Sequence, residues 1–357
     1  MVAASSLVAD DRRSAELRAV LDTLLGEPVG PIDWIGGGGN SQVYRIRCGT
    51  AWYAAKVYFA DQERARGRLD VEFSALGYLW HSGVRAIPRP VAADPAHRCA
   101  VYEWIEGSPV VPDEISQADV DGAVEFLAIL KAIAATPSPT AIGDAADACF
   151  SAEALFANID ARVERFEGVD TSGSGGADAG HFLRCEFAPV FERMRARCAK
   201  HHADFGSHSA APVPRSERTL SPSDFGFHNA VRRPDGRIVF VDFEYFGWDD
   251  AAKTVADFLL HPHPAMALSG NHKRRFAHGM LRTFREAPAL RGRLDLVYPL
   301  YGLKWCLILL NEFLPEHLSR RRFAQRLGAD SQAVHHAQLV KARSLLDRID
   351  QYDGFPY

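Results

Sequence analysis

Three polar residues between Ser221 and Gly247 have the types and the order that phosphoryl transfer requires. Asp224 and Asn229 share one polar loop, and Asp242 closes the second of two short apolar runs that follow. A carboxylate can accept the proton of an attacking hydroxyl, while an amide oxygen and a second carboxylate are the ligands that Mg²⁺ prefers. The stretch therefore predicts a site for kinase-type chemistry.

The two apolar runs predict a β-hairpin that brings these side chains together. The runs span 229–231 and 238–241, and the turn-forming sequence Arg233-Pro234-Asp235-Gly236 separates them. Because a hairpin returns the chain on itself, we expect Asp242 to come back beside Asn229. One loop and one hairpin would then carry the whole site.

A second candidate site lies near the N-terminus, where a glycine cluster enters an alternating strand. Glycines let backbone amides approach phosphate oxygens without obstruction by Cβ, although a glycine cluster alone is more often a plain turn. The next strand, 51–58, carries Lys56 among apolar neighbours, and such a lysine could simply reach solvent. The cluster comprises Gly36, Gly37, Gly38, Gly39, Asn40 and Ser41.

In this order, the features resemble the aminoglycoside phosphotransferase/choline kinase-like family, the small-molecule relatives of protein kinases. Asp224 and Asn229 match the Asp and Asn of its catalytic loop, and Asp242 matches its metal-binding Asp. The resemblance implies that Asp224 is catalytic, that Asn229 and Asp242 bind Mg²⁺, and that the glycine cluster and Lys56 bind the phosphates of ATP (or GTP).

The resemblance also implies a partner for Lys56 and a segment that holds the purine. Glu72, in a helix expected over 61–80, is favoured as the carboxylate that orients Lys56, with Glu63 and Asp70 as competitors. Backbone groups of the segment from Glu103 through Trp104 to Ile105 match the hinge of the family. An ordinary exit from a strand is the alternative for that segment.

The chain departs from the family at several positions, which indicates a divergent subgroup. Pro222-Ser223 stands where the family usually has His-Gly, and Ser41 takes the third small position of the glycine loop. The family commonly has Asp at the position of Thr254, whereas this chain offers Asp257.

The fold implied is α+β: a two-lobed protein-kinase-like fold with an N-terminal lobe over 1–107 and a C-terminal lobe over 108–357. The first would hold an antiparallel sheet with one helix, preceded by a lead-in helix over 14–25. The second would be mainly helical, with the helix expected over 180–201 lying beneath the catalytic loop and an acceptor cleft floored by the last helices.

Composition limits the classes of partner. The 357 residues are 47% hydrophobic and 24% charged, and the net charge of −4 argues against a nucleic-acid partner. The six cysteines form no CxxC pair, so neither a zinc site nor a disulfide framework is indicated. With no leader and no membrane span in the sequence, we expect a cytoplasmic protein without a membrane partner. Oligomeric state is not indicated.

Three groups of histidines are candidates for metal ligands. His261-Pro262-His263, His201-His202 and His335-His336 have no companion pair at metal-ligand spacing. They are interpreted as surface or capping histidines.

The function expected is transfer of the γ-phosphoryl group of ATP (or GTP) to a hydroxyl of a small metabolite such as an aminoglycoside, sugar or amino alcohol. The alternative is a nucleotide-binding pseudokinase or regulatory module without turnover, motivated by Pro222-Ser223 and Ser41. Transfer to a protein acceptor is a third possibility that uses the same nucleotide machinery.

Overall fold

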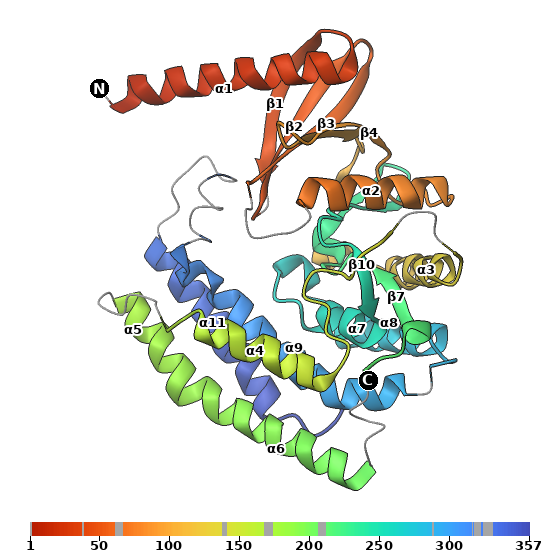
Figure 1. The fold of residues 1–357 in the computed structure, drawn as a ribbon, viewed down its shortest axis with the longest axis vertical. Helices are drawn as coiled ribbons and strands as arrows, with labels where there is room; N and C mark the ends of the chain where they lie inside the picture. Colours follow the sequence, from red (N-terminus) through yellow and green to blue (C-terminus); the bar gives the residue numbers. More distant parts are fainter. Residues whose placement is uncertain are drawn as a thin grey trace. The chain divides into compact units, whose positions relative to one another are not determined.

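The chain forms two compact units in the computed structural model (Figure 1). The structure describes residues 2–37, 39–60, 67–137, 141–167, 174–205, 212–287, 289–315, 317, 323 and 331–357. Among these, the first unit ends at Glu106 and includes Phe323, and the second begins at Gly107. The division falls one residue before the expected lobe boundary, and the sequence did not predict that Phe323 belongs to the first unit.

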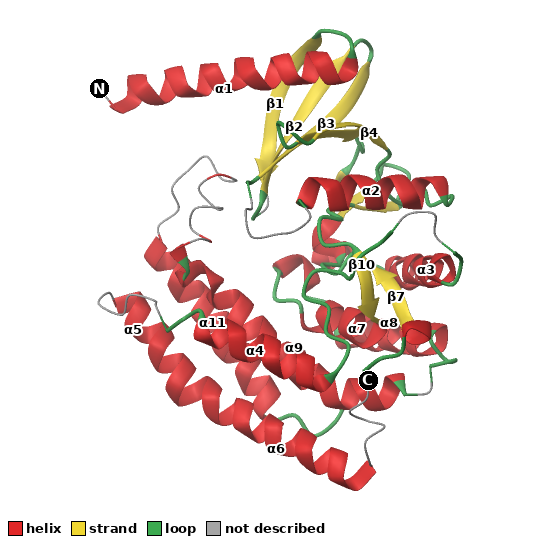
Figure 2. Ribbon diagram, viewed as in Figure 1, coloured by secondary structure: helices red, strands yellow, loops and turns green. Residues whose placement is uncertain are grey.

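The first unit is built on an antiparallel sheet (Figure 2), whose five strands have the order β1-β2-β3-β5-β4. Its central strands carry apolar side chains on the face that packs against a helix, and Ile46, Ala55 and Val101 are fully buried there. The strands are β1 (Val29–Gly37), β2 (Ser41–Cys48), β3 (Ala51–Tyr58), β4 (Pro90–Asp94) and β5 (Cys99–Glu103).

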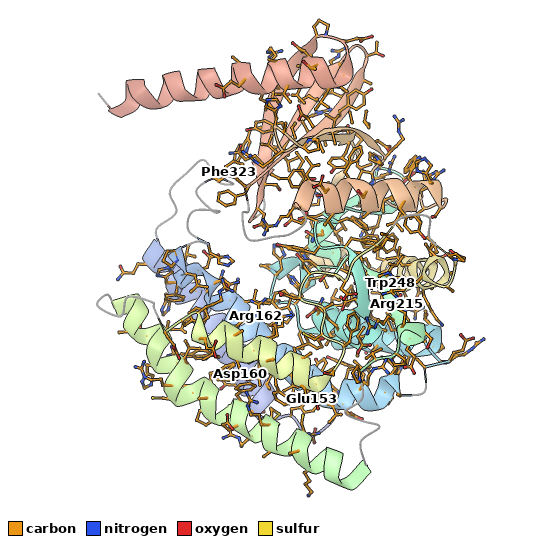
Figure 3. All side chains as sticks on the ribbon, viewed as in Figure 1. Glu153, Asp160, Arg162, Arg215, Trp248 and Phe323 are labelled. Atoms are coloured by element: carbon orange, nitrogen blue, oxygen red, sulfur yellow. The ribbon has the colours of Figure 1, made fainter. Side chains whose placement is uncertain are left out.

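Two helices and one distant residue complete the first unit. Helix α1 (Val2–Leu25) contacts β1 and β4 and buries Leu21, and it begins earlier than the predicted lead-in helix. Helix α2 (Arg68–His81) contacts β4 and β5, while most of the first turns predicted for it lie outside the described residues. The carbonyl of Phe323, the residue labelled in Figure 3, accepts a 2.5 Å hydrogen bond from Gln42 Nε2.

The second unit is mainly helical, as expected. Its longer helices have apolar stripes, and the capping box of Ser116 and Asp119 begins the first of them. They are α3 (Gln117–Ala134), α4 (Ala152–Glu164), α5 (Ser174–His181), α6 (Ala188–Phe205), α7 (Ala251–Leu260), α8 (Gly270–Thr283), α9 (Leu290–Leu309) and α11 (Ser331–Asp350).

The second unit has two small antiparallel sheets, and the three-stranded one contains the predicted hairpin. Strand β7 (Arg218–Ser221) pairs with β10 (Gly247–Asp250), and β8 (Ala230–Arg232) pairs with both β6 (Ser108–Pro109) and β9 (Ile238–Phe240). The turn is closed by a 2.9 Å hydrogen bond from the Gly236 N–H to the Arg233 carbonyl, so the predicted hairpin is confirmed.

Aromatic packing fixes the loop between β7 and β8. The ring of Phe225 lies 5.6 Å from Phe126 of α3, 4.7 Å from Phe240 of β9 and 6.0 Å from Phe258 of α7, centroid to centroid. Helices α3 and α7 thus support the loop that carries Asp224. The helix expected there from the 180–201 stripe is α6, which packs against α9 and α11 instead.

The structure also bears on the cysteines and on membrane-spanning helices. The six cysteines are all free thiols, and Cys185 is exposed while Cys99, Cys149, Cys198 and Cys306 are buried. Among the helices of the described residues, none combines the length and apolar character needed to cross a membrane.

Candidate active site

In the first unit, Lys56 and Glu72 form a buried ion pair. Lys56 Nζ lies 2.7 Å from Glu72 Oε2, and the two side chains are 9% and 4% exposed. Lys56 sits on the central strand β3 opposite Val43 and Ala100, and Glu72 projects from α2. Glu72, the carboxylate favoured over Glu63 and Asp70, is therefore the one that pairs with Lys56.

A second hydrogen bond fixes the same carboxylate. The Tyr58 hydroxyl lies 2.7 Å from Glu72 Oε2 and 2.7 Å from the Tyr102 hydroxyl. Burial, and after it the negative charge of Glu72, raises the pKa of Tyr58 well above its ordinary value. The phenol therefore keeps its proton and remains a donor. Glu72 is thus held by the Tyr58 hydroxyl of β3, and it holds the Lys56 ammonium of the same strand in turn.

The glycine cluster forms the hairpin end between β1 and β2. Gly36 and Gly37 are the last residues of β1 and pair with Val43 and Gln42, and Gly39 and Asn40 form a bend. Ser41 is buried at the start of β2, and Gly38 lies outside the described residues.

The proposed purine-binding segment lies at the end of the first unit. The Glu103 N–H already donates to the Arg89 carbonyl at 2.8 Å, and Trp104 Nε1 donates to Glu106 Oε2 at 3.0 Å. Ile105 is 8% exposed. The unit boundary follows Glu106, so this segment leads along the chain from the first unit into the second, and its binding of the purine stays a prediction.

In the second unit, a tight turn presents Asp224. The Asp224 N–H donates to the Pro222 carbonyl at 3.0 Å, and Ser223 between them has a φ of 69°. This i to i+2 bond with positive φ is a γ-turn in the left-handed region, which is strained for residues other than glycine. Ser223 occupies the place of the glycine of the resembled motif.

Hydrogen bonds stabilise this strained serine. Its N–H donates to Ser221 Oγ at 3.0 Å, and its hydroxyl donates to the Ala146 carbonyl at 3.1 Å and accepts from Lys253 Nζ at 2.8 Å. Thr254 Oγ1 donates to Ser221 Oγ at 3.2 Å. Buried hydroxyls and a lysine thus support the turn, and the sequence showed no sign of the roles of Ser221, Thr254 or Lys253.

The hairpin brings Asn229 and Asp242 together, as predicted. Asn229 Nδ2 donates to the Asp224 carbonyl at 3.0 Å and lies 3.4 Å from Asp224 Oδ2. The Val241 N–H donates to the Asn229 carbonyl at 2.9 Å, which places Asp242 next to Asn229 across the hairpin. Asp242 has a φ of 68°, a second residue in the left-handed region at this site.

The donor atoms of this pair fit a hard divalent cation. The hydrogen bonds of the Asn229 side chain use Nδ2, so its amide oxygen is the atom with lone pairs to offer. Asp242, the residue after the Val241 N–H that bonds to the Asn229 carbonyl, adds a carboxylate from the returning chain. Oxygen donors in small number match the preference of Mg²⁺, which keeps several waters and phosphate oxygens in its coordination shell.

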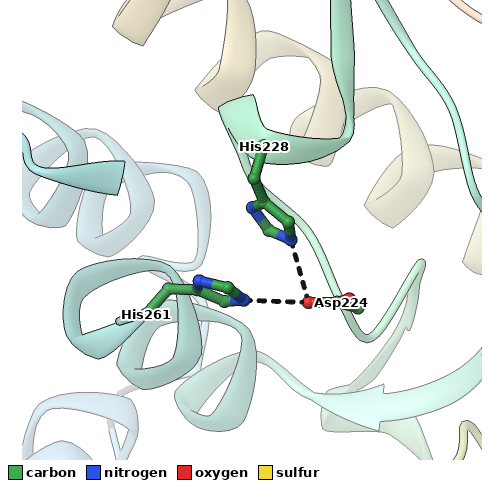
Figure 4. A group of neighbouring side chains, drawn as sticks. All are labelled: Asp224, His228 and His261. Carbon is green, nitrogen blue, oxygen red and sulfur yellow. Dashed lines mark hydrogen bonds and ion pairs between the residues drawn. The ribbon is translucent and has the colours of Figure 1, made fainter. Parts of the chain in front are cut away.

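His228 and His261 contact Asp224 directly (Figure 4). Their Nε2 atoms lie 3.0 and 3.2 Å from Asp224 Oδ1, and their side chains are 6% and 9% exposed. The surface or capping interpretation was therefore wrong for His261. It was right for His263, whose ring accepts the Ala265 N–H at 3.1 Å.

These contacts set the charge of Asp224. Burial alone would raise the pKa of Asp224, but the hydrogen bonds from His228 and His261 outweigh it and hold the pKa well below its ordinary value. The carboxylate is therefore ionised at neutral pH. Burial lowers the pKa of His261, which favours the neutral imidazole beside it.

A buried cluster of charges lies next to this turn. Lys253 Nζ is 3.0 Å from Asp249 Oδ2 and 3.0 Å from Asp257 Oδ2. Burial opposes the charge on Lys253, but the two carboxylates raise its pKa above the ordinary value. Burial raises the pKa of Asp249 to about 6 despite Lys253. Both carboxylates are thus already paired with an internal cation.

Comparisons with solved structures identify the fold. A spectinomycin phosphotransferase in complex with ADP and spectinomycin aligns with a TM-score of 0.63 at 12% identity, covering 95% of this chain and 98% of that one. A choline kinase from Streptococcus pneumoniae gives 0.57 at 16%, covering 94% and 99%. A choline/ethanolamine kinase family protein from Mesorhizobium loti gives 0.56 at 18%, covering 95% and 99%.

No protein-family model matches this sequence, and no curated protein matches it. The likeness is therefore one of fold, along almost the whole length of both chains. The chain has the α+β, two-lobed kinase-like fold of the aminoglycoside phosphotransferases and choline/ethanolamine kinases.

Proposed function

We propose that this protein is a phosphotransferase that moves the γ-phosphoryl group of ATP (or GTP) to a hydroxyl of a small metabolite. The observation that carries the proposal is geometric: a tight turn presents Asp224, Asn229 donates to the Asp224 carbonyl, and the hairpin returns the chain at Val241 and Asp242 to Asn229. The fold and the buried pair of Lys56 and Glu72 support it, because small-molecule kinases of this fold use these groups in this order.

In this reaction the acceptor oxygen forms a bond to the γ-phosphorus while the bridging bond to the β-phosphate breaks and the nucleoside diphosphate leaves with its electron pair. Asp224 would orient the acceptor hydroxyl and receive its proton. Lys56, oriented by Glu72, would bind the α- and β-phosphates. Asn229 and Asp242 would hold Mg²⁺, which when bound neutralises charge on the phosphate oxygens. Catalysis is then mainly positioning and charge neutralisation.

The buried charges of the second unit do not select an acceptor class. Because Asp249 and Asp257 both pair with Lys253, these carboxylates give no support to a cationic acceptor. The acceptor panel therefore includes uncharged sugars together with amino alcohols and aminoglycosides, which are cationic at neutral pH. We propose that the enzyme works in the cytoplasm, where ATP is available.

Two variants in the same hairpin region test the role of Asp224. We expect Asp224→Asn to lower turnover by about a hundredfold or more while keeping nucleotide binding, since an amide cannot accept the proton. Asp235→Asn, in the exposed turn, is the matched control and should keep wild-type turnover. Both are assayed as ADP release with an acceptor panel. Full turnover in Asp224→Asn would contradict the assignment.

The same assay separates the proposal from the pseudokinase alternative. A binding module would be stabilised by nucleotide in a thermal-shift experiment but would release no ADP with any acceptor. The proposal expects both stabilisation and acceptor-dependent ADP release.

A further inference from the structure

Two histidines from distant parts of the second unit converge on one oxygen of Asp224. The rings of His228 and His261 are stacked, with centroids 3.9 Å apart and planes inclined by 24°. Both Nε2 atoms point at Asp224 Oδ1, at 3.0 and 3.2 Å (Figure 4). The other carboxylate oxygen, Oδ2, lies 3.4 Å from Asn229 Nδ2. The two oxygens of one carboxylate thus have different environments.

Backbone contacts define the protonation of His261. The His263 N–H donates to His261 Nδ1 at 3.1 Å, so this nitrogen carries a lone pair and no proton. A neutral imidazole with a bare Nδ1 has its proton on Nε2. Nε2–H of His261 therefore donates to Asp224 Oδ1.

His228 also has its proton on Nε2, but a different observation shows this. Its Nδ1 is buried and makes no hydrogen bond within the described part of the chain. A proton at this nitrogen would be buried without an acceptor, which is unfavourable, whereas a bare nitrogen costs less. His228 therefore also donates through Nε2–H, and Oδ1 accepts two hydrogen bonds from neutral rings.

The same contacts argue against a metal at this cluster. The ligand atoms of Asp224, His228 and His261 lie within 4.8 Å of one another, close enough to share an ion. A histidine that binds metal through Nε2 usually donates its Nδ1–H to a neighbour. His261 Nδ1 accepts a hydrogen bond instead, so its Nε2 has a proton where a metal ligand needs a lone pair.

Neighbouring packing fixes both rings. The rings of Trp305 and His261 pack edge to face, with centroids 4.5 Å apart and planes inclined by 65°. Trp305 Nε1 donates to Asp257 Oδ1 at 2.9 Å. Asp257 is paired in turn with Lys253. Gly226 leaves room for His228, because a Cβ at Gly226 would lie 2.8 Å from His228 Nδ1.

We propose that His228 and His261 are positioning residues, which hold Oδ1 of Asp224 so that Oδ2 is the oxygen presented to the acceptor hydroxyl. This inference rests on the proposed function. Two donors on Oδ1 restrict rotation of the carboxylate and stabilise its negative charge. The carboxylate becomes a weaker base but a better-oriented one, which suits a loose transition state in which proton transfer comes late.

Paired substitutions test the positioning role. His261→Leu removes the donor, whereas His261→Gln offers an amide N–H near the former Nε2. We expect His261→Leu to lower kcat tenfold or more with little change in KM for ATP, and His261→Gln to recover most of the loss. His228→Leu and His228→Gln should behave in the same way. The exposed His278→Leu on α8 is the control and should keep wild-type kcat.

A spectroscopic measurement on the full-length wild-type chain tests the hydrogen bonds without turnover. Long-range ¹⁵N–¹H correlation of ¹⁵N-labelled histidine should show protonated Nε2 and bare Nδ1 for both rings. A proton on Nδ1 of either ring, or a kcat of His261→Gln as low as that of His261→Leu, would overturn the inference. Wild-type kcat in His261→Leu would overturn it too.

The two proposals fail in distinguishable ways. Correct tautomers together with no turnover in wild type on any acceptor would contradict the proposed function and remove the positioning role with it, while confirming the hydrogen bonds. Turnover in wild type with the wrong tautomers would contradict only the inference about the histidines.

Discussion

At the scale of single residues, Ser223 shows how the turn that carries Asp224 tolerates a departure from the resembled motif. A left-handed conformation costs a residue with a Cβ about 1–2 kcal/mol. Ser223 adopts that conformation, and its hydroxyl gains hydrogen bonds to the Ala146 carbonyl and to Lys253 Nζ that a glycine could not make. The side chain offsets the strain that its own Cβ introduces.

Substitutions at Ser223 separate these two contributions. Ser223→Ala keeps the strain and loses the hydroxyl, so we expect it to lower the free energy of unfolding by about 1–3 kcal/mol. Ser223→Gly loses the hydroxyl but relieves the strain, and should be more stable than Ser223→Ala by about 1 kcal/mol. Urea unfolding of the three proteins measures this order. Equal stability of Ser223→Ala and wild type would show that the hydroxyl contributes nothing.

The buried Asp249 predicts a pH dependence of stability. Its pKa is raised from 3.8 to about 6 by burial, so the folded state binds this proton more tightly than the unfolded state. The free energy of unfolding should therefore fall as pH rises towards 6, by at most about 1.4 kcal/mol per pH unit, and level off above it.

Asp249→Asn is the comparison for this effect, because its amide cannot titrate. The difference in unfolding free energy between wild type and Asp249→Asn should fall most steeply from pH 5 to pH 6, more gently from pH 6 to pH 7, and stay constant from there to pH 7.5, measured by urea unfolding at each pH. A difference that is flat over the whole range would mean that Asp249 does not take up a proton on folding.

Residue types and spacing predicted part of the site but not its supports. Glu72 was favoured from its place in a helix after the Lys56 strand, and the structure pairs the two. His261 was misinterpreted because metal and surface criteria consider only neighbours in sequence. Its partner Asp224 is separated from it by a hairpin and by α7, so only the tertiary fold reveals their contact.

At the scale of elements, close backbone packing anchors β10 beside the loop that carries Asp224. A Cβ at Gly247 would lie 2.4 Å from the Ala145 nitrogen and 2.6 Å from the Gly143 carbonyl oxygen. These are backbone atoms, so β10 or the adjoining segment would have to move. Strand β10 pairs with β7, and the displacement would reach the turn at Ser223.

We therefore expect Gly247→Ala to destabilise the protein by about 1–3 kcal/mol and to lower kcat. Gly122→Ala is the matched control, because Gly122 is exposed within α3 and a Cβ there meets nothing within 4 Å. That control should stabilise the protein by up to about 1 kcal/mol. Thermal unfolding and ADP release measure both variants. An undisturbed Gly247→Ala would contradict this packing argument.

Element type was more predictable than element packing. The period of apolar residues predicted helices over 14–25, 61–80 and 180–201, because that period reflects which face is buried, whereas α4 (Ala152–Glu164) was not predicted. The period did not show which helix lies against which neighbour, so α6 was expected beneath the catalytic loop where α3 and α7 provide the packing. Many helices of one unit have similar apolar stripes, and the sequence does not say which stripes meet.

At the scale of the whole molecule, the chain shares its fold with small-molecule kinases over nearly its full length at 12–18% identity. The ordered set of glycine cluster, Lys56, Glu72, Asp224, Asn229 and Asp242 was enough to predict this fold, because each member has a fixed place in it. The acceptor could not be predicted, since its contacts come from side chains with no recurring spacing.

The most direct test of the account is ADP release by wild type and Asp224→Asn in the presence of Mg²⁺, ATP or GTP, and a panel of hydroxylated metabolites. We predict acceptor-dependent ADP release by wild type, loss of that release when Mg²⁺ is chelated, and a decrease of about a hundredfold or more in Asp224→Asn. Nucleotide binding without ADP release on any acceptor, or equal release by the two proteins, would contradict the central claim.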